Sequence, residues 1–233
     1  MMPLKRPWLA VVFVACLFVI APAQAPPRPT AACPENHHEI PRGAIKVPLP
    51  DVRQGDNYSC GVAALMSILA YYGVGPEDYG VLKKKLGTTT RDGTNFRRMV
   101  KFAGLQGLQA EARPEMKVEQ LERCLDRGRP VICSIQAYDE DEKRSPVARR
   151  TLYREKDENG HYVVAIGYDR DNLYFMDPSL DGRRGYLPKG EFEERWHDNE
   201  GTEKKPHLLR HLGLVIWKEG GKSACDHRAR KID

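Results

Sequence analysis

The sequence predicts an α+β domain, in which a group of helices precedes an antiparallel sheet. Residues 60–74 contain no charged side chain and are apolar nearly all round, as expected of a helix buried inside a domain. Residues 131–137, 161–168 and 173–176 are rich in β-branched, aromatic and other apolar side chains, which favours strands. Between the last two, the sequence Asp-Arg-Asp-Asn at 169–172 is a turn signal that predicts a hairpin.

Four helices are expected in the first part of the chain. The helix at residue 60 can be capped by Asn57 or Ser59. A second is expected over residues 76–86, a third from its cap at Thr94 to Gly104, and a fourth over 118–126. All but the second have apolar residues at helical spacing, and each has a glycine at or just after its end.

Two further segments complete the predicted domain. Residues 208–217 are expected to form a final strand. Residues 138–160 include a long, highly charged stretch, which is expected to be a loop. Long loops in compact domains are often lids or binding segments, so substrate specificity is expected to depend partly on this one.

The start of the chain has the features of a signal peptide, predicted to cover residues 1–25. A positively charged beginning is followed by an apolar run at 9–20, which is too short to span a bilayer, and by a small-x-small cleavage pattern that ends at Ala25. We therefore expect a secreted or periplasmic protein with no stable membrane insertion after cleavage. Lipidation at Cys16 and an uncleaved membrane anchor stay open as alternatives.

The 233 residues are enough for one domain with a sizeable core. We expect a polar lead-in at 26–46, the domain at 47–218 and a polar tail at 219–233. The formal net charge is +5, and loss of Lys5 and Arg6 with the signal peptide would lower it to about +3. A charge this small does not indicate a nucleic-acid partner.

Signal cleavage would leave an odd number of cysteines, which are Cys33, Cys60, Cys124, Cys133 and Cys225. In an oxidising compartment an odd number implies at least one free thiol. Cys33 can pair with Cys225, and Cys124 with Cys133. Alternatively, Cys124 and Cys133 are small buried thiols on a helix and a strand.

The parts of a thiol-dependent active site are present in the sequence. Cys60 is expected at the first turn of a helix, where the helix dipole favours a thiolate. Gln54 lies in the polar segment before it and can fold back over the thiol as a hydrogen-bond donor. His161 begins one strand of the hairpin, and Asp177 ends the other. A three-residue turn would put His161 and Asp177 on one face, whereas a four-residue turn would put them on opposite faces.

Three motifs carry a family resemblance that extends over about residues 47–198. They are Gln54-x5-Cys60-Gly61, Gly160-His161-Tyr-Val-Val-Ala-Ile-Gly-Tyr-Asp and Met176-Asp177-Pro178-Ser179. With these motifs the chain resembles the bacteriocin-processing cysteine peptidases, which cut after a double glycine, and it looks like a stand-alone, exported relative.

The resemblance implies a papain-like fold and a role for each of four residues. Cys60 would be the nucleophile, His161 the base and acid, Asp177 the group that orients His161, and Gln54 the oxyanion donor. The implied partner is a peptide or protein substrate, and the chemistry needs no cofactor or metal.

Other interpretations of the same residues stay open. Cys60 can be a buried structural thiol, and Asp177 can cap the turn at Pro178. With the same triad, the protein can transfer its acyl group to an amine instead of water. It can also be an inactive peptide-binding module, because a fold does not by itself determine a function.

Overall fold

The computed structural model describes residues 39–76, 78–139, 141, 143–180, 184–199 and 208–220. The proposed signal peptide, Cys16, Cys33 and Cys225 lie outside these residues, so the predictions about export and about the Cys33–Cys225 pair stay predictions. Within the described part of the chain, no helix has the length and apolar composition needed to cross a membrane.

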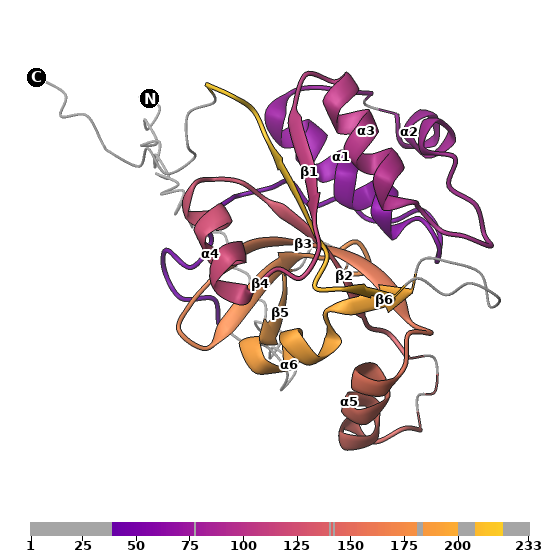
Figure 1. Cartoon of the computed structure of the whole chain (residues 1–233), viewed down its shortest axis with the longest axis vertical. Coiled ribbons are helices and arrows are strands. Elements are labelled where there is room, and N and C mark those ends of the chain that lie inside the picture. Colours follow the sequence, from indigo (N-terminus) through magenta and orange to yellow (C-terminus); the bar gives the residue numbers. More distant parts are fainter. Residues whose placement is uncertain are drawn as a thin grey trace, which may run out of the picture. The chain divides into compact units, whose positions relative to one another are not determined.

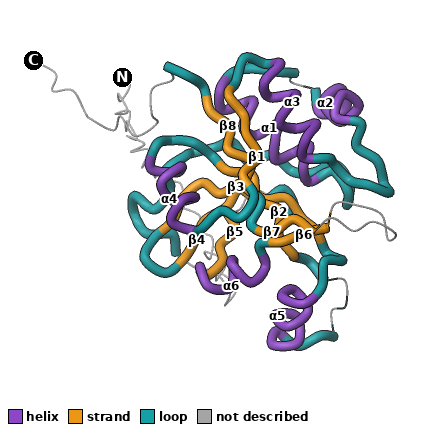
Figure 2. The backbone as a smooth tube through the Cα atoms, in the orientation of Figure 1, coloured by secondary structure: helices purple, strands orange, loops and turns teal. Residues whose placement is uncertain are grey.

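The predicted α+β fold is confirmed (Figures 1 and 2). A six-stranded antiparallel sheet has the strand order β1-β8-β2-β3-β4-β5, and β6 pairs separately with β7. The elements follow in the order α1 (Cys60–Tyr72), α2 (Tyr79–Leu86), α3 (Phe96–Leu105), β1 (Gln109–Arg113), α4 (Val118–Asp126), β2 (Val131–Gln136), α5 (Pro146–Glu155), β3 (Gly160–Tyr168), β4 (Asn172–Met176), β5 (Arg184–Pro188), α6 (Lys189–Arg195), β6 (His197–Asn199), β7 (Leu208–Arg210) and β8 (Gly213–Trp217).

Helices α1, α2 and α3 pack against one another, as Figure 1 shows, and α1 also contacts β3. Nine residues of α1 are buried, as predicted for a helix without charges, and these are residues 60–65 and 67–69. The helix ends at Gly73, whose φ of 65° is the left-handed conformation that glycine adopts most easily. Helix α1 thus meets the sheet at the strand that carries His161, whereas α3 contacts β1 and β8.

The predicted helix starts need three corrections. Ser59 occupies the N-cap position of α1 without capping it, because its hydroxyl accepts a hydrogen bond from Tyr79. Helix α2 begins three residues later than predicted and is capped by Asp78. Helix α3 is capped by Asn95, whose side chain accepts two backbone N–H groups, and not by Thr94.

Two predicted segments differ from the structure. The segment predicted to be a loop contains α5, which begins with Ser145 as a side-chain cap and Pro146 in the first turn. The predicted final strand is two strands in different sheets, β7 and β8. The chain bends between them at His211, which has a φ of 45°.

The hairpin of β3 and β4 contains a bulge that changes its register. At the turn, Tyr168 pairs with Leu173, so the turn between these paired positions has four residues, 169–172. The register shifts between Ala165 and Gly167, and beyond the shift Ala165 pairs with Phe175. The extra residue in β3 thus offsets the extra residue in the turn.

Residues 44–47 pack on this bulge. The backbone N–H groups of Lys46 and Val47 both donate to the carbonyl of Ile166, and Tyr168 donates to the carbonyl of Ala44. A side chain at Gly167 would collide with the Ala44 carbonyl, so only glycine allows this close approach.

Candidate active site

Cys60 is the first residue of α1 and carries a free, nearly buried thiol, with 9% of the residue exposed. The first turn of α1 contains no acidic side chain. The backbone N–H of Tyr162 donates to Sγ of Cys60 over 3.5 Å. A helix start and a backbone N–H donor both place positive partial charge beside Sγ.

His161 is hydrogen-bonded to Asp177, with 2.8 Å between Nε2 and Oδ1. Burial lowers the pKa of His161, but hydrogen bonds to Asp177 and Cys60 raise it, and the balance places it at about 10. Since Nε2 faces Asp177, Nδ1 is the nitrogen available to the thiol. The imidazole of His161 therefore lies between Cys60 and Asp177, and both contacts favour its protonated, positively charged form.

Asp177 accepts three hydrogen bonds. Oδ1 accepts from Nε2 of His161 and from the backbone N–H of Ser179, and Oδ2 accepts from the hydroxyl of Tyr138. Burial raises the pKa of Asp177, but the contact with His161 and the other donors lower it below the ordinary value. Asp177 both bonds the imidazole of His161 and caps the turn, so the two sequence interpretations of this residue are compatible.

The bulge in β3 explains how His161 reaches Asp177. The four-residue turn alone would place the two side chains on opposite faces of the hairpin. Beyond the bulge, the register sets His161 opposite Ser179 when it is continued along the strands. Asp177 is then the diagonal neighbour of His161 on the same face, which was predicted only for a three-residue turn.

Gln54 lies beside the turn that follows Asp177. Its backbone N–H donates to the carbonyl of Pro178 over 3.0 Å, and its Oε1 accepts from the hydroxyl of Ser179 over 3.3 Å. With Oε1 engaged in this way, the side-chain NH₂ is the donor left for a ligand. The structure therefore brings Gln54 to the same turn as Asp177, while Cys60 and His161 meet from α1 and β3.

Sequence reasoning missed the polar contacts of Tyr138 and Ser179. Ser179 had a signal, because the residue two positions after an Asp in a turn commonly donates its backbone N–H to that Asp. Tyr138 had a weaker one. It follows β2, in which Ile135 pairs with His161, so the chain beyond β2 passes close to His161.

The other described cysteines do not share these features. Cys124 and Cys133 are free and buried. The interpretation as small buried thiols is therefore confirmed, and the alternative of a disulfide between them is wrong. Burial raises the pKa of both thiols, which disfavours the thiolate. Among the described residues, no group of His, Cys, Asp and Glu side chains could hold a metal ion.

The sequence matches the model of the Peptidase_C39 like family over residues 45–203. Over 171 residues it is 28% identical to the transport/processing ATP-binding protein ComA of Streptococcus pneumoniae strain R6, covering 70% of this chain and 20% of ComA. The chain thus spans about a fifth of the length of that relative.

Two solved structures share the fold. The peptidase domain of Streptococcus ComA matches with a TM-score of 0.52 and 19% identity, covering 72% of this chain and 98% of that domain. A C39-like peptidase from Bacillus anthracis matches with a TM-score of 0.50 and 19% identity, covering 75% and 97%. The comparison places Cys60 and His161 in an α+β fold of the kind found in peptidase domains.

Proposed function

Because this chain belongs to the Peptidase_C39 like family, as its motifs predicted, we propose that it is a cysteine peptidase in which Cys60, His161 and Asp177 form the triad. The observation that carries the proposal is the 2.8 Å contact between Nε2 of His161 and Oδ1 of Asp177, with the imidazole also bonded to Cys60. A thiol, a base and a group that orients the base are the three parts that nucleophilic catalysis requires.

Acylation begins when Nδ1 of His161 holds the proton of Cys60 and Sγ attacks the substrate carbonyl carbon. The carbonyl oxygen becomes an oxyanion, which the side-chain NH₂ of Gln54 and the backbone N–H of Cys60 stabilise. That N–H belongs to the first turn of α1, whose N–H groups lack acceptors inside the helix. The proton on His161 then moves to the leaving amine, and the C–N bond breaks.

Deacylation releases the second product from the thioester. His161 takes a proton from water, the resulting hydroxide attacks the thioester carbonyl, and the C–S bond breaks to restore Cys60. Throughout both steps, the ionised Asp177 keeps Nε2 of His161 protonated and turned away from the thiol. No cofactor is needed for this sequence.

A fluorogenic peptide library that includes double-glycine sequences tests the proposal. We expect cleavage by the wild type and complete loss in Cys60→Ala, because Ala cannot form the thioester. Cys124→Ala is the matched control, since it removes a buried thiol that has no role in the mechanism, and it should keep its activity. Cleavage by Cys60→Ala at the wild-type rate would overturn the assignment. Analysis of products formed with an added amine separates hydrolysis from acyl transfer.

We also propose that the peptidase works outside the cytoplasm. The support is the charge and apolar pattern of residues 1–25 and the cleavage pattern at Ala25. N-terminal sequencing of the protein recovered from a periplasmic or culture-medium fraction should begin at Pro26. Recovery of the full-length chain in the cytoplasmic fraction alone would contradict export.

A further inference from the structure

Tyr138 makes two contacts with the buried pair His161 and Asp177. Its hydroxyl donates to Oδ2 of Asp177 over 2.7 Å, whereas His161 uses Oδ1 of the same carboxylate. Its ring meets the imidazole edge-on, with 5.1 Å between the centroids and 87° between the planes. Tyr138 is 47% exposed, while His161 and Asp177 are 6% and 8% exposed, so the tyrosine covers this pair on the side of solvent.

From these contacts we propose that Tyr138 is a positioning residue for the His161–Asp177 pair, an inference that rests on the proposed function. By holding Oδ2, the hydroxyl stops the carboxylate from rotating about its Cβ–Cγ bond, so that Oδ1 stays aimed at Nε2. By covering the imidazole, the ring limits the access of water, which would compete for the same hydrogen bond.

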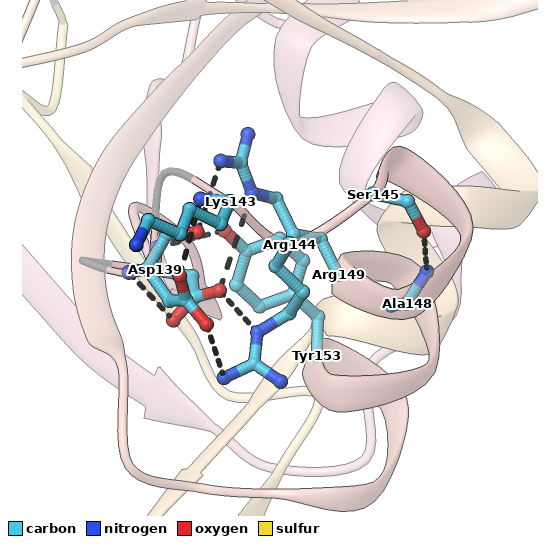
Figure 3. A network of polar contacts seen from close by, with 8 residues as sticks. Asp139, Lys143, Arg144, Ser145, Ala148, Arg149 and Tyr153 are labelled. Atoms are coloured by element: carbon cyan, nitrogen blue, oxygen red, sulfur yellow. Dashed lines mark hydrogen bonds and ion pairs between the residues drawn. The ribbon is translucent and has the colours of Figure 1, made fainter.

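The backbone at Tyr138 is itself held in place. Its φ of 60° lies in the left-handed region, which is unfavourable for a bulky residue unless its surroundings impose it. The next residue supplies that constraint. The backbone N–H of Asp139 donates to the Tyr153 hydroxyl over 2.8 Å, and Oδ2 of Asp139 lies 2.6 Å from Nε of Arg144 and 4.0 Å from Nε of Arg149 (Figure 3).

These contacts connect α5 to the active site. Tyr153 and Arg149 belong to α5, and Arg144 lies just before it. Tyr153 is almost completely buried, and the guanidinium of Arg195 stacks on its ring at 4.2 Å. The charged segment that was predicted to be a loop thus contains a fixed support for Tyr138.

The ionisation states suit this role. Burial raises the pKa of Tyr138, and the negative charge of Asp177 raises it further, so the hydroxyl remains a donor. The titratable groups that influence Asp177 and Tyr138 are His161, its partner Cys60, Tyr153 and Arg195. A hydrogen-bond donor favours the ionised form of a carboxylate, so Tyr138 lowers the pKa of Asp177.

The test measures alkylation of Cys60 by iodoacetamide from pH 4 to 10, which requires no known substrate. The variants are Tyr138→Phe, which removes only the hydroxyl, and Tyr138→Ala, which also removes the ring. Tyr168→Phe is the matched control, because it also deletes a tyrosine hydroxyl bonded to an aspartate, here Asp126 at 2.8 Å. Tyr168 lies seven residues along β3 from His161, or about 23 Å away at about 3.3 Å per residue.

We expect the acid limb of the alkylation profile to move to higher pH in Tyr138→Phe, by at least about half a pH unit. Without the donor, Asp177 takes up a proton at a higher pH, and the imidazolium then loses the partner that supports the thiolate. Tyr138→Ala should shift further because water reaches the pair, and Tyr168→Phe should match the wild type. Asp139→Asn, which weakens the support of Tyr138, should shift in the same direction by less.

Coincident profiles for Tyr138→Phe, Tyr168→Phe and the wild type would overturn the role of Tyr138 and leave the triad intact. A wild-type profile with the single step of an isolated thiol near its ordinary pKa of about 8.5 would overturn both the triad and the positioning role. The two failures are therefore distinguishable. Thermal unfolding of each variant, followed by circular dichroism, confirms that the compared proteins are folded.

Discussion

The backbone N–H of Tyr162 points at the sulfur of Cys60, at 3.5 Å, although the two residues are 102 positions apart in the sequence. This contact fixes the distance between the start of α1 and the strand that carries His161. The neighbouring Gly61 makes the approach possible. A Cβ atom at residue 61 would lie 2.7 Å from the Cβ of Thr94 and 3.1 Å from the ring of Tyr162.

Gly61→Ala should therefore destabilise the protein, by about 1–3 kcal/mol, and reduce Cys60 reactivity, because α1 must move away from Thr94 and from Tyr162 of β3. Gly104→Ala in α3 is the matched control. A Cβ at residue 104 meets no atom within 4 Å, so the same substitution should leave stability unchanged or raise it by up to about 1 kcal/mol. Urea unfolding measures both. Equal midpoints for the two variants would contradict the close approach of α1 to β3.

Replacing Asp177 should shift the pH dependence of peptide cleavage. The carboxylate is one of the groups that raise the pKa of His161, so Asp177→Ala and Asp177→Asn should move the basic limb of the rate profile to lower pH. Asn retains a hydrogen-bond acceptor and should keep more activity than Ala, for which we expect a loss of about 100-fold or more. An unchanged basic limb in both variants would show that Asp177 does not support the imidazolium.

The proton on His161 should also be visible by NMR. The pKa is raised to about 10 in the folded protein, with Cys60 among the causes, so Cys60→Ala should lower it toward the ordinary value of 6.5. Because the folded state binds this proton more tightly, its contribution to stability is complete below about pH 6.5 and is lost as the pH rises toward 10. A wild-type His161 imidazole that titrates near pH 6.5 would be inconsistent with stabilisation of its charged form by Cys60 and Asp177.

Ser179 should affect the rate of catalysis by holding the side chain of Gln54. Ser179→Ala removes the donor that holds Oε1 of Gln54 but keeps the backbone N–H bonded to Asp177, so we expect kcat to fall about three- to tenfold with little change in KM. Gln54→Ala should cost about 100-fold or more in kcat. The double variant should be no slower than Gln54→Ala, because Ser179 acts on the reaction through that side chain. Additive losses would indicate an independent role for Ser179.

The sequence predicted the elements that have strong local signals. Helix α4 has the predicted bounds, and α1 was predicted from its uncharged residues and from Gly73. Strands β1 and β5 were missed because neither has a run of fully buried apolar residues. Helix α5 was missed because its charged composition suggested a loop, although Ser145 and Pro146 were a recognisable helix start.

The residues of the candidate site were likewise predicted only where they have a local sequence signal. Cys60, His161, Asp177 and Gln54 stand in motifs, and the structure brings them to one place. Tyr138 belongs to no motif, and its contact with Asp177 depends on the fold of a segment whose helix was not predicted. Tertiary contacts of this kind have no periodicity that a single sequence can show.

Because of the bulge in β3, the face on which Asp177 lies depends on whether the number of residues between it and His161 is odd or even. Deleting one residue from the turn at 169–172 would turn Asp177 to the face opposite His161 as long as the bulge between Ala165 and Gly167 remained. Deleting one residue from the turn and one from the bulge would return Asp177 to the face of His161. It would also remove the carbonyl of Ile166 that accepts hydrogen bonds from Lys46 and Val47. A redesigned hairpin can therefore keep the His161–Asp177 contact only through paired length changes, and residues 44–47 then need another attachment.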